Sequence, residues 1–183
     1  MNCVPIRSRP STWAGLARDR VWRGIRTWPD LRGWGRTALI AALTFAGMAA
    51  VGLAGGLYHP TSQLAGLPAR LAVAFVAPAL GEELVFRGLL VPDRSETPRP
   101  WRAITVVTAI FTLWHVAEAL VLLPKARPIF LRVDFLACAA ILGLGCALVR
   151  WRTSSLWPAV ILHWLAVVVW QTWLGGPGLE ALR

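Results

Sequence analysis

The sequence has 183 residues, enough for one domain or one bundle of helices. Hydrophobic residues make up 56% and charged residues 15%, whereas soluble domains carry roughly 25% charge. This composition excludes a disordered chain and argues against a water-soluble globule. Lys and Arg number 19 against 9 Asp and Glu, but a chain this hydrophobic requires lipid as its main partner. The composition therefore predicts an all-α protein, a polytopic bundle of transmembrane helices.

Residues 1–36 form a basic leader in which tryptophans lie among arginines. The residues concerned are Arg7, Arg9, Arg18, Arg20, Arg23, Arg26, Arg32 and Arg36, with Trp13, Trp22, Trp28 and Trp34. This mixture suits a segment on an anionic inner leaflet, with Arg at the phosphates and Trp at headgroup level. An RNA-binding arm is the rival interpretation. Because the apolar run begins only near Thr37, it is interpreted as a membrane span and not as a secretory signal.

Five apolar stretches in residues 37–183 approach the length of about 20 helical residues that crosses a bilayer. They lie near 37–57, 69–91, 103–123, 133–149 and 156–174, and predict a single bundle of five to six spans. Lys and Arg favour the cytoplasmic side of a membrane, which predicts a cytoplasmic N-terminus. One basic loop, with Lys125, Arg127 and Arg132, would then face outside. We expect a multi-pass protein of the cell inner (plasma) membrane.

Ionisable residues inside the spans are candidates for a functional site, because each costs about 2.5–3.5 kcal/mol on insertion scales. The second span contains Glu82, Glu83 and Arg87 within six residues. Glu83 and Arg87 are four residues apart with the acid first, which is the favourable order for a helical ion pair. That pair leaves Glu82 without a counterion of its own. The third span contributes His115 and the fifth contributes His163.

Depth in the membrane places three of these residues at one level. At about 1.5 Å per helical residue, Glu82 lies about 14 Å, His115 about 18 Å and His163 about 11 Å from the inner end of its span. A shift of about four residues at a span boundary changes each depth by about 6 Å, which is enough to account for the differences among the three depths. We therefore expect the three side chains to converge on one water in the cytoplasmic half of the membrane.

Three short motifs contain these residues. They are Glu82-Glu83-Leu84-Val85-Phe86-Arg87, Phe111-Thr112-Leu113-Trp114-His115, and His163 in the last span. In this order they are similar to the Glu-Glu-x-x-x-Arg, Phe-x-x-x-His and terminal His motifs of the CPBP family. This is the CAAX-protease and bacteriocin-processing group of glutamic-type intramembrane proteases. The resemblance covers about residues 68–170, which would form a protease-like core.

The resemblance implies an intramembrane endopeptidase that needs no metal and no other cofactor. Glu82 would be the general base that activates water, His115 would assist it, and His163 would stabilise the oxyanion. The supporting residues would be Glu83, Arg87, Phe111 and Glu118. The expected partners are membrane lipids and a membrane-associated polypeptide substrate, and no nucleic acid is expected.

Val167 departs from the family, which has Asn or a similar polar residue four positions after the last histidine. Losing one oxyanion donor costs about 2.7–4 kcal/mol in acyl-transfer enzymes. The alternative function is therefore a non-catalytic membrane scaffold or bacteriocin-immunity relative that binds peptide in the same cavity. A small channel or transporter is a third class. Gln171 shares the helix face of His163, but two turns beyond it is too far along the axis to replace the donor.

Glu118 raises a metal-dependent alternative, because it follows His115 by three residues and shares its helix face. With Glu82 and His163 it could complete a metal site, since three nitrogen or oxygen ligands plus water suffice for catalytic zinc. No His-Glu-x-x-His motif occurs, and the three cysteines have no four-ligand zinc spacing. The metal-independent interpretation is therefore preferred.

Overall fold

Helices supply all the regular secondary structure in residues 12–178, the part of the chain that the computed structural model describes. The all-α class predicted from composition is confirmed. Cys3, Arg7 and Arg9 of the basic leader lie outside the described residues, so the interpretations that involve them stay predictions.

The helical elements follow one another with short connections. In chain order they are α1 (Trp13–Arg26), α2 (Leu31–Ala54), α3 (Leu67–Ala74), η1 (Phe75–Glu82), η2 (Leu84–Leu89), α4 (Trp101–Ala117), η3 (Glu118–Leu122), η4 (Pro124–Ala126), α5 (Arg127–Phe130), α6 (Val133–Thr153) and α7 (Trp157–Trp173). The elements η1, η2 and η3 are π-helices, in which the turn is wider than in an α-helix, and η4 is a short 3₁₀ turn.

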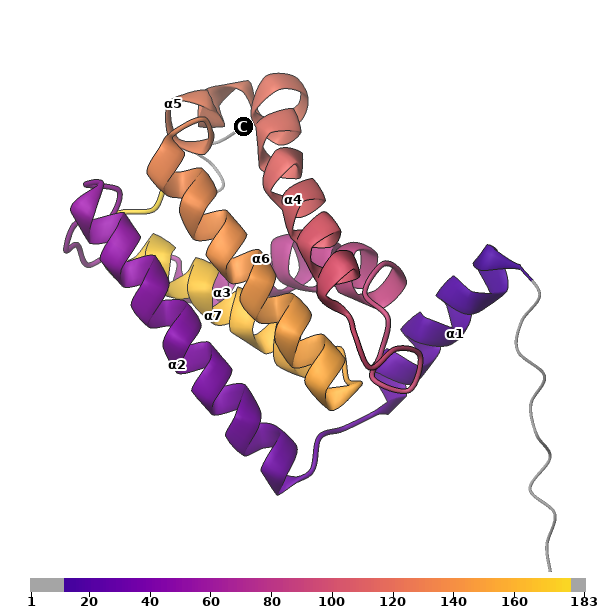
Figure 1. The fold of residues 1–183 in the computed structure, drawn as a ribbon. Helices are drawn as coiled ribbons and strands as arrows, with labels where there is room; N and C mark the ends of the chain where they lie inside the picture. Colours follow the sequence, from indigo (N-terminus) through magenta and orange to yellow (C-terminus); the bar gives the residue numbers. More distant parts are fainter. Residues whose placement is uncertain (1–11, 179–183) are drawn as a thin grey trace, which may run out of the picture.

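Helix α6 lies at the centre of the bundle, with α2, α4 and α7 packed around it (Figure 1). Glycines on α6 explain how closely its neighbours approach. A Cβ at Gly145 would collide with the side chain of Thr44 on α2, and one at Gly143 would lie 2.9 Å from the ring of Phe111 on α4. Small residues at contacts between helices are typical of membrane bundles, where close packing replaces the hydrophobic effect.

Three helices in the described residues are long and apolar enough to cross a membrane: Leu31–Ala54, Trp101–Leu122 and Val133–Thr153. The other two predicted spans correspond to the composite segment from Leu67 to Leu89 and to the 17-residue helix α7. Large apolar side chains remain exposed on these helices, among them Leu39, Leu43, Leu113 and Val121. Such a surface suits lipid and not water, so the chain is a helical membrane bundle. The count of five to six spans stays a prediction.

Helix α2 begins six residues before the apolar run. Asp30 is its N-cap residue, and the carboxylate Oδ1 accepts a hydrogen bond from the N–H of Gly33 at 2.7 Å. The cap starts the helix at Leu31, whereas hydropathy alone suggested a start near Thr37. Part of the predicted leader is therefore the first turn and a half of α2.

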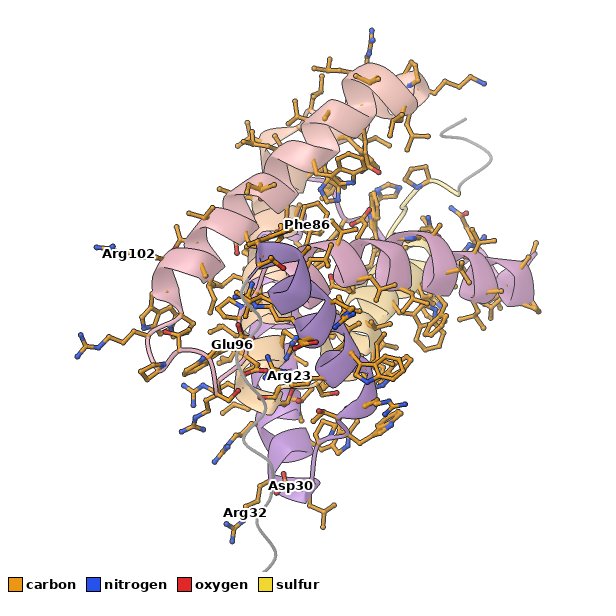
Figure 2. All side chains as sticks on the ribbon, turned by 90° about the vertical axis from the view of Figure 1, so that its right-hand side faces the viewer. Arg23, Asp30, Arg32, Phe86, Glu96 and Arg102 are labelled. Atoms are coloured by element: carbon orange, nitrogen blue, oxygen red, sulfur yellow. The ribbon has the colours of Figure 1, made fainter. Side chains whose placement is uncertain are left out.

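Helix α1 packs across one end of the bundle through ion pairs to the loop that follows η2. Arg20 Nε donates to Glu96 at 2.7 Å and Arg23 Nη2 donates to the same carboxylate at 3.1 Å. Figure 2 shows Arg23 and Glu96 facing one another, whereas Arg102 points away from the bundle. The N–H of Leu156, at the start of α7, also donates to the carbonyl of Gly24 at 2.8 Å. The leader is thus attached to the bundle by specific contacts.

Asp93 in the same loop strengthens this attachment near neutral pH. Burial alone would raise the pKa of its carboxyl, but hydrogen bonds from Ser95 and the charge of Arg23, 3.4 Å away, outweigh burial, and the pKa is lowered. A carboxyl with a lowered pKa contributes stability above its unfolded value of about 3.9 and loses it as the pH falls through the folded value. The contribution is therefore fully present at neutral pH.

Glu96→Gln removes the charge that Arg20 and Arg23 share, and we expect α1 to loosen from the bundle. Partly exposed ion pairs contribute up to about 1 kcal/mol each, so the bundle itself should remain folded. Limited trypsin digestion in detergent should cut after these arginines several-fold faster in the variant. The matched control is Asp19→Asn, because the Asp19 carboxylate lies 3.9 Å from exposed Arg18 on the outer side of α1. Equal digestion rates in both variants would contradict the attachment.

Candidate active site

The helix from Leu67 to Leu89 widens where its two glutamates lie. Pro78 is inside η1, and it lacks the N–H that would bond to the carbonyl four residues earlier. A wider π turn accommodates such a missing bond, and π turns occur frequently at functional sites. Glu82 ends η1, and Glu83 connects it to η2. The two adjacent carboxylates therefore lie in the irregular part of this span.

Glu83 binds two other buried side chains. Its Oε1 accepts from Arg87 Nη1 at 2.9 Å and from His163 Nδ1 at 2.9 Å, and both Glu83 and Arg87 are completely buried. The ion pair was expected from the spacing, whereas the bond to His163 was not. Because a carboxylate paired with Arg87 only accepts, we assign a proton to Nδ1 of His163. The Nε2 atom is then the ring nitrogen that remains for chemistry.

Arg87 connects the site to two further helices, α6 and α4. Its Nη2 donates to the carbonyl of Gly143 on α6 at 2.9 Å, and its guanidinium lies over the ring of Phe111 on α4, 4.1 Å from the centroid. Gly143 also leaves room for the guanidinium, because a Cβ added at this position would lie 3.3 Å from Arg87 Nη2. Phe111 therefore supports the site through its ring. It also does so through its backbone carbonyl, which lies 2.9 Å from Nδ1 of His115.

His115 is oriented by its own helix. Its Nδ1 lies 2.9 Å from the carbonyl oxygen of Phe111, one turn earlier, and a carbonyl can only accept. The proton of a neutral ring is therefore on Nδ1, and Nε2 is an acceptor. Aromatic rings of Phe111, Phe130 and Phe135 contact the imidazole edge to face, so the buried ring is fixed in place.

Glu82 lies close to both histidines. Glu82, His115 and Glu118 each present one ligand atom, and the three atoms lie within 4.8 Å of one another. In addition, Nε2 of His163 lies 4.0 Å from Oε2 of Glu82. Glu82, His115 and His163, the three residues expected to converge, thus lie together, and Glu118 lies beside them. Their catalytic roles stay a prediction.

The residues that could hold a metal differ in one member from the predicted set. The sequence suggested Glu82, Glu118 and His163, but the structure groups the two glutamates with His115. His163 is bound through its Nδ1 to Glu83 instead, and its Nε2 lies 4.0 Å from Oε2 of Glu82. Two carboxylates and one imidazole are a suitable donor set for a divalent cation, and equally for one bound water.

A cavity of about 540 Å³ adjoins these groups, lined by α2, η1, α4, α6 and α7. Its wall is mostly apolar, and Val167 is part of it, so the family's polar position is apolar here. Trp114 also lines the cavity, and its indole nitrogen is buried without a hydrogen-bond partner among the described residues. The sequence reasoning passed over Trp114 inside the Phe-x-x-x-His motif. The available signal was an indole N–H in an apolar span, which requires a partner.

A bundle of apolar helices that encloses two glutamates, two histidines and an arginine defines a polytopic membrane protein with an intramembrane polar site. The family model described as type II CAAX prenyl endopeptidase Rce1-like matches residues 64–169, which is more than half of the chain. The chain belongs to this family of endopeptidases, and the family predicted from the three motifs is confirmed. No curated protein and no solved structure matches the chain.

Arg87→Met leaves Glu83 buried without its guanidinium, and we expect a loss of about 3–5 kcal/mol in the free energy of unfolding. Glu83→Met should be similarly unstable, because it leaves Arg87 unpaired. The double variant removes both charges and should recover part of the loss, as buried pairs replaced by apolar side chains often do. Thermal unfolding in detergent measures all four proteins. A double variant as unstable as the sum of the single ones would show that the two side chains are not coupled.

Proposed function

We propose that the protein is a glutamic-type intramembrane endopeptidase that hydrolyses a peptide bond in a membrane-associated protein or peptide. Membership of an endopeptidase family supports the reaction class. The observation that carries the mechanism is the meeting of Glu82 and His115 within 4.8 Å, beside an apolar cavity with room for part of a polypeptide.

In this proposal a water between Glu82 and His115 meets two acceptors. Carboxylate oxygens only accept, and Nε2 of His115 accepts because its Nδ1–H is directed to the carbonyl of Phe111. The water therefore donates both of its hydrogens, and a lone pair on its oxygen remains free to attack a carbonyl carbon. Glu82 takes up one proton as the general base, a role that typically accelerates a reaction about 10²–10⁴-fold.

His163 is proposed to stabilise the oxyanion. Since its Nδ1–H bonds to Glu83, Nε2 can donate only when the ring carries both protons. Glu82 and Glu83 supply two negative charges and Arg87 supplies one positive charge. A protonated His163 supplies a second positive charge, which offsets the negative charge of the nearby Glu82. A donor aimed at the developing negative charge then acts where water is scarce.

The reaction is completed when Glu82 returns its proton to the leaving nitrogen. The C–N bond breaks as the tetrahedral intermediate collapses, and the products are a carboxylic acid and an amine, which become a carboxylate and an ammonium when the second proton of the water passes from the acid to the amine. Val167 supplies no second donor to the oxyanion, a difference worth about 2.7–4 kcal/mol of transition-state stabilisation in acyl-transfer enzymes. Turnover is therefore expected to be slow compared with relatives that have a polar residue at this position.

The proposed setting is the inner (plasma) membrane, with the N-terminus cytoplasmic and lipids as partners. Trp13, Trp22 and Trp28 are each more than half exposed on or just after α1, and the guanidinium of Arg26 lies 3.8 Å from the Trp22 ring centroid. Exposed indoles beside arginines suit the headgroup region of an anionic leaflet. This end of the bundle also collects the basic ends of α4 and α6, which supports the cytoplasmic side.

The second candidate function is a non-catalytic scaffold or immunity protein that binds peptide in the same cavity. The apolar side chain of Val167 in the cavity wall favours it. A binding protein does not need a general base, so the two candidates differ in what they require of Glu82.

Glu82→Gln and His115→Ala should each abolish cleavage of a co-expressed membrane substrate, because one removes the proton acceptor and the other removes the second acceptor that holds the water. Immunoblotting of the substrate measures cleavage, and membrane fractionation checks insertion. Arg102→Gln is the control, since this exposed side chain points away from the bundle (Figure 2). Cleavage retained in both site variants would rule the mechanism out, and biological activity retained with Glu82→Gln would favour the scaffold.

Chelation separates water activation by Glu82 alone from activation by a metal at Glu82, His115 and Glu118. We expect EDTA and 1,10-phenanthroline to leave the cleavage rate of the purified protein unchanged, because a carboxylate and an imidazole suffice to activate the water. Loss of activity on chelation, with recovery on adding Zn²⁺, would instead support the metal-dependent alternative.

A further inference from the structure

The cavity contains buried polar groups that the mechanism does not use. Gln171 on α7 is only 3% exposed and lines the cavity, yet its Oε1 has no hydrogen-bond partner among the described residues. The adjacent Trp170 also lines the cavity, and its indole nitrogen is likewise buried and unpartnered. A buried polar group without a partner is unfavourable, because it has given up its hydrogen bonds to water. These two side chains therefore suit a ligand that supplies hydrogen-bonding groups.

The surroundings of this pair are apolar and aromatic. The ring of Trp170 lies 5.5 Å from that of Phe135, and Tyr58 and Leu57 complete this part of the wall. In such surroundings an amide and an indole are the main means of recognising a polar group.

We propose that Trp170 and Gln171 bind the main chain of an extended segment of the substrate, an inference that rests on the proposed function. A peptide group presents one N–H and one C=O, which match the acceptor and donor atoms that these side chains leave unpartnered. A substrate helix must lose its internal hydrogen bonds around the bond to be cut, and the freed groups require partners inside a membrane. An acyl or isoprenoid chain has no groups for them.

The position of Gln171 relates this contact to the cleavage point. Gln171 follows His163 by eight residues, so it lies about 12 Å further along α7. An extended chain advances about 3.3 Å per residue. The peptide group contacted by Gln171 is therefore about three to four residues from the bond that is cut. This distance also explains why Gln171 cannot act as the oxyanion donor missing at Val167.

The test measures binding in the Glu82→Gln background, where the proposed cleavage cannot occur. The probes are a fluorescent peptide of about 20 Leu and Ala residues and, separately, farnesene, an isoprenoid hydrocarbon without polar atoms. Gln171→Met keeps the length of the side chain but removes its polar atoms, and we expect about tenfold weaker peptide binding with unchanged farnesene binding. Gln63→Met, at an exposed glutamine outside the cavity, should change neither affinity.

Thermal unfolding checks that Gln171→Met remains folded, and Gln171→Leu provides a second variant with the same expectation. Unchanged peptide affinity in a folded variant would overturn the inference. Equal weakening for peptide and farnesene would overturn it as well, because the residue would then act on the shape of the cavity and not on the main chain of the ligand. Either result leaves the proposed function to its own test, since cleavage by the protein with Glu82 intact is measured separately.

Discussion

Glu83 is completely buried between the guanidinium of Arg87 and the imidazole of His163, and the arrangement of the whole site depends on this contact. A charge withdrawn from water inside a membrane protein is stable only when its partners are fixed around it. Here the partners come from different helices. Arg87 is further bound by the carbonyl of Gly143 and by the ring of Phe111. Four helical segments are therefore held in one register by a single buried charge pair.

The two histidines receive different environments from this arrangement. His115 directs Nδ1–H to a backbone carbonyl of its own helix, whereas His163 directs Nδ1–H to the carboxylate of Glu83. A carbonyl suits a neutral ring, and an ionised carboxylate suits a protonated one. In the proposed mechanism this difference makes one imidazole an acceptor for water and the other a donor to the oxyanion. Residues expected only to support the site would then set the roles of the catalytic ones.

Features that depend on helix geometry alone were predictable from the sequence. The spacing of Glu83 and Arg87 predicted their ion pair, and the constant rise of an α-helix predicted that Glu82 lies near His115 and His163. Family membership followed from short motifs in a fixed order. These predictions needed only distances along single helices, which the sequence determines directly.

Features that depend on how helices rotate against one another were not predictable. The bond between His163 and Glu83, and the place of His115 instead of His163 beside Glu82 and Glu118, both depend on the rotation of one helix about its axis relative to another. The early start of α2 was missed because Arg32 and Arg36 lower the hydropathy of a turn that Asp30 caps. The docking of α1 was also missed, since nothing in the sequence distinguishes the arginines that meet Glu96 from those that remain exposed.

The most direct test is a cryo-electron microscopy map of the protein in lipid nanodiscs, at a resolution that shows side chains and ordered water around Glu82. We predict one water within about 3.2 Å of both the Glu82 carboxylate and a ring nitrogen of His115, with His163 bonded to Glu83. A Glu82 carboxylate that points at the acyl chains, or one too far from both imidazoles for a single water to bridge, would contradict this prediction.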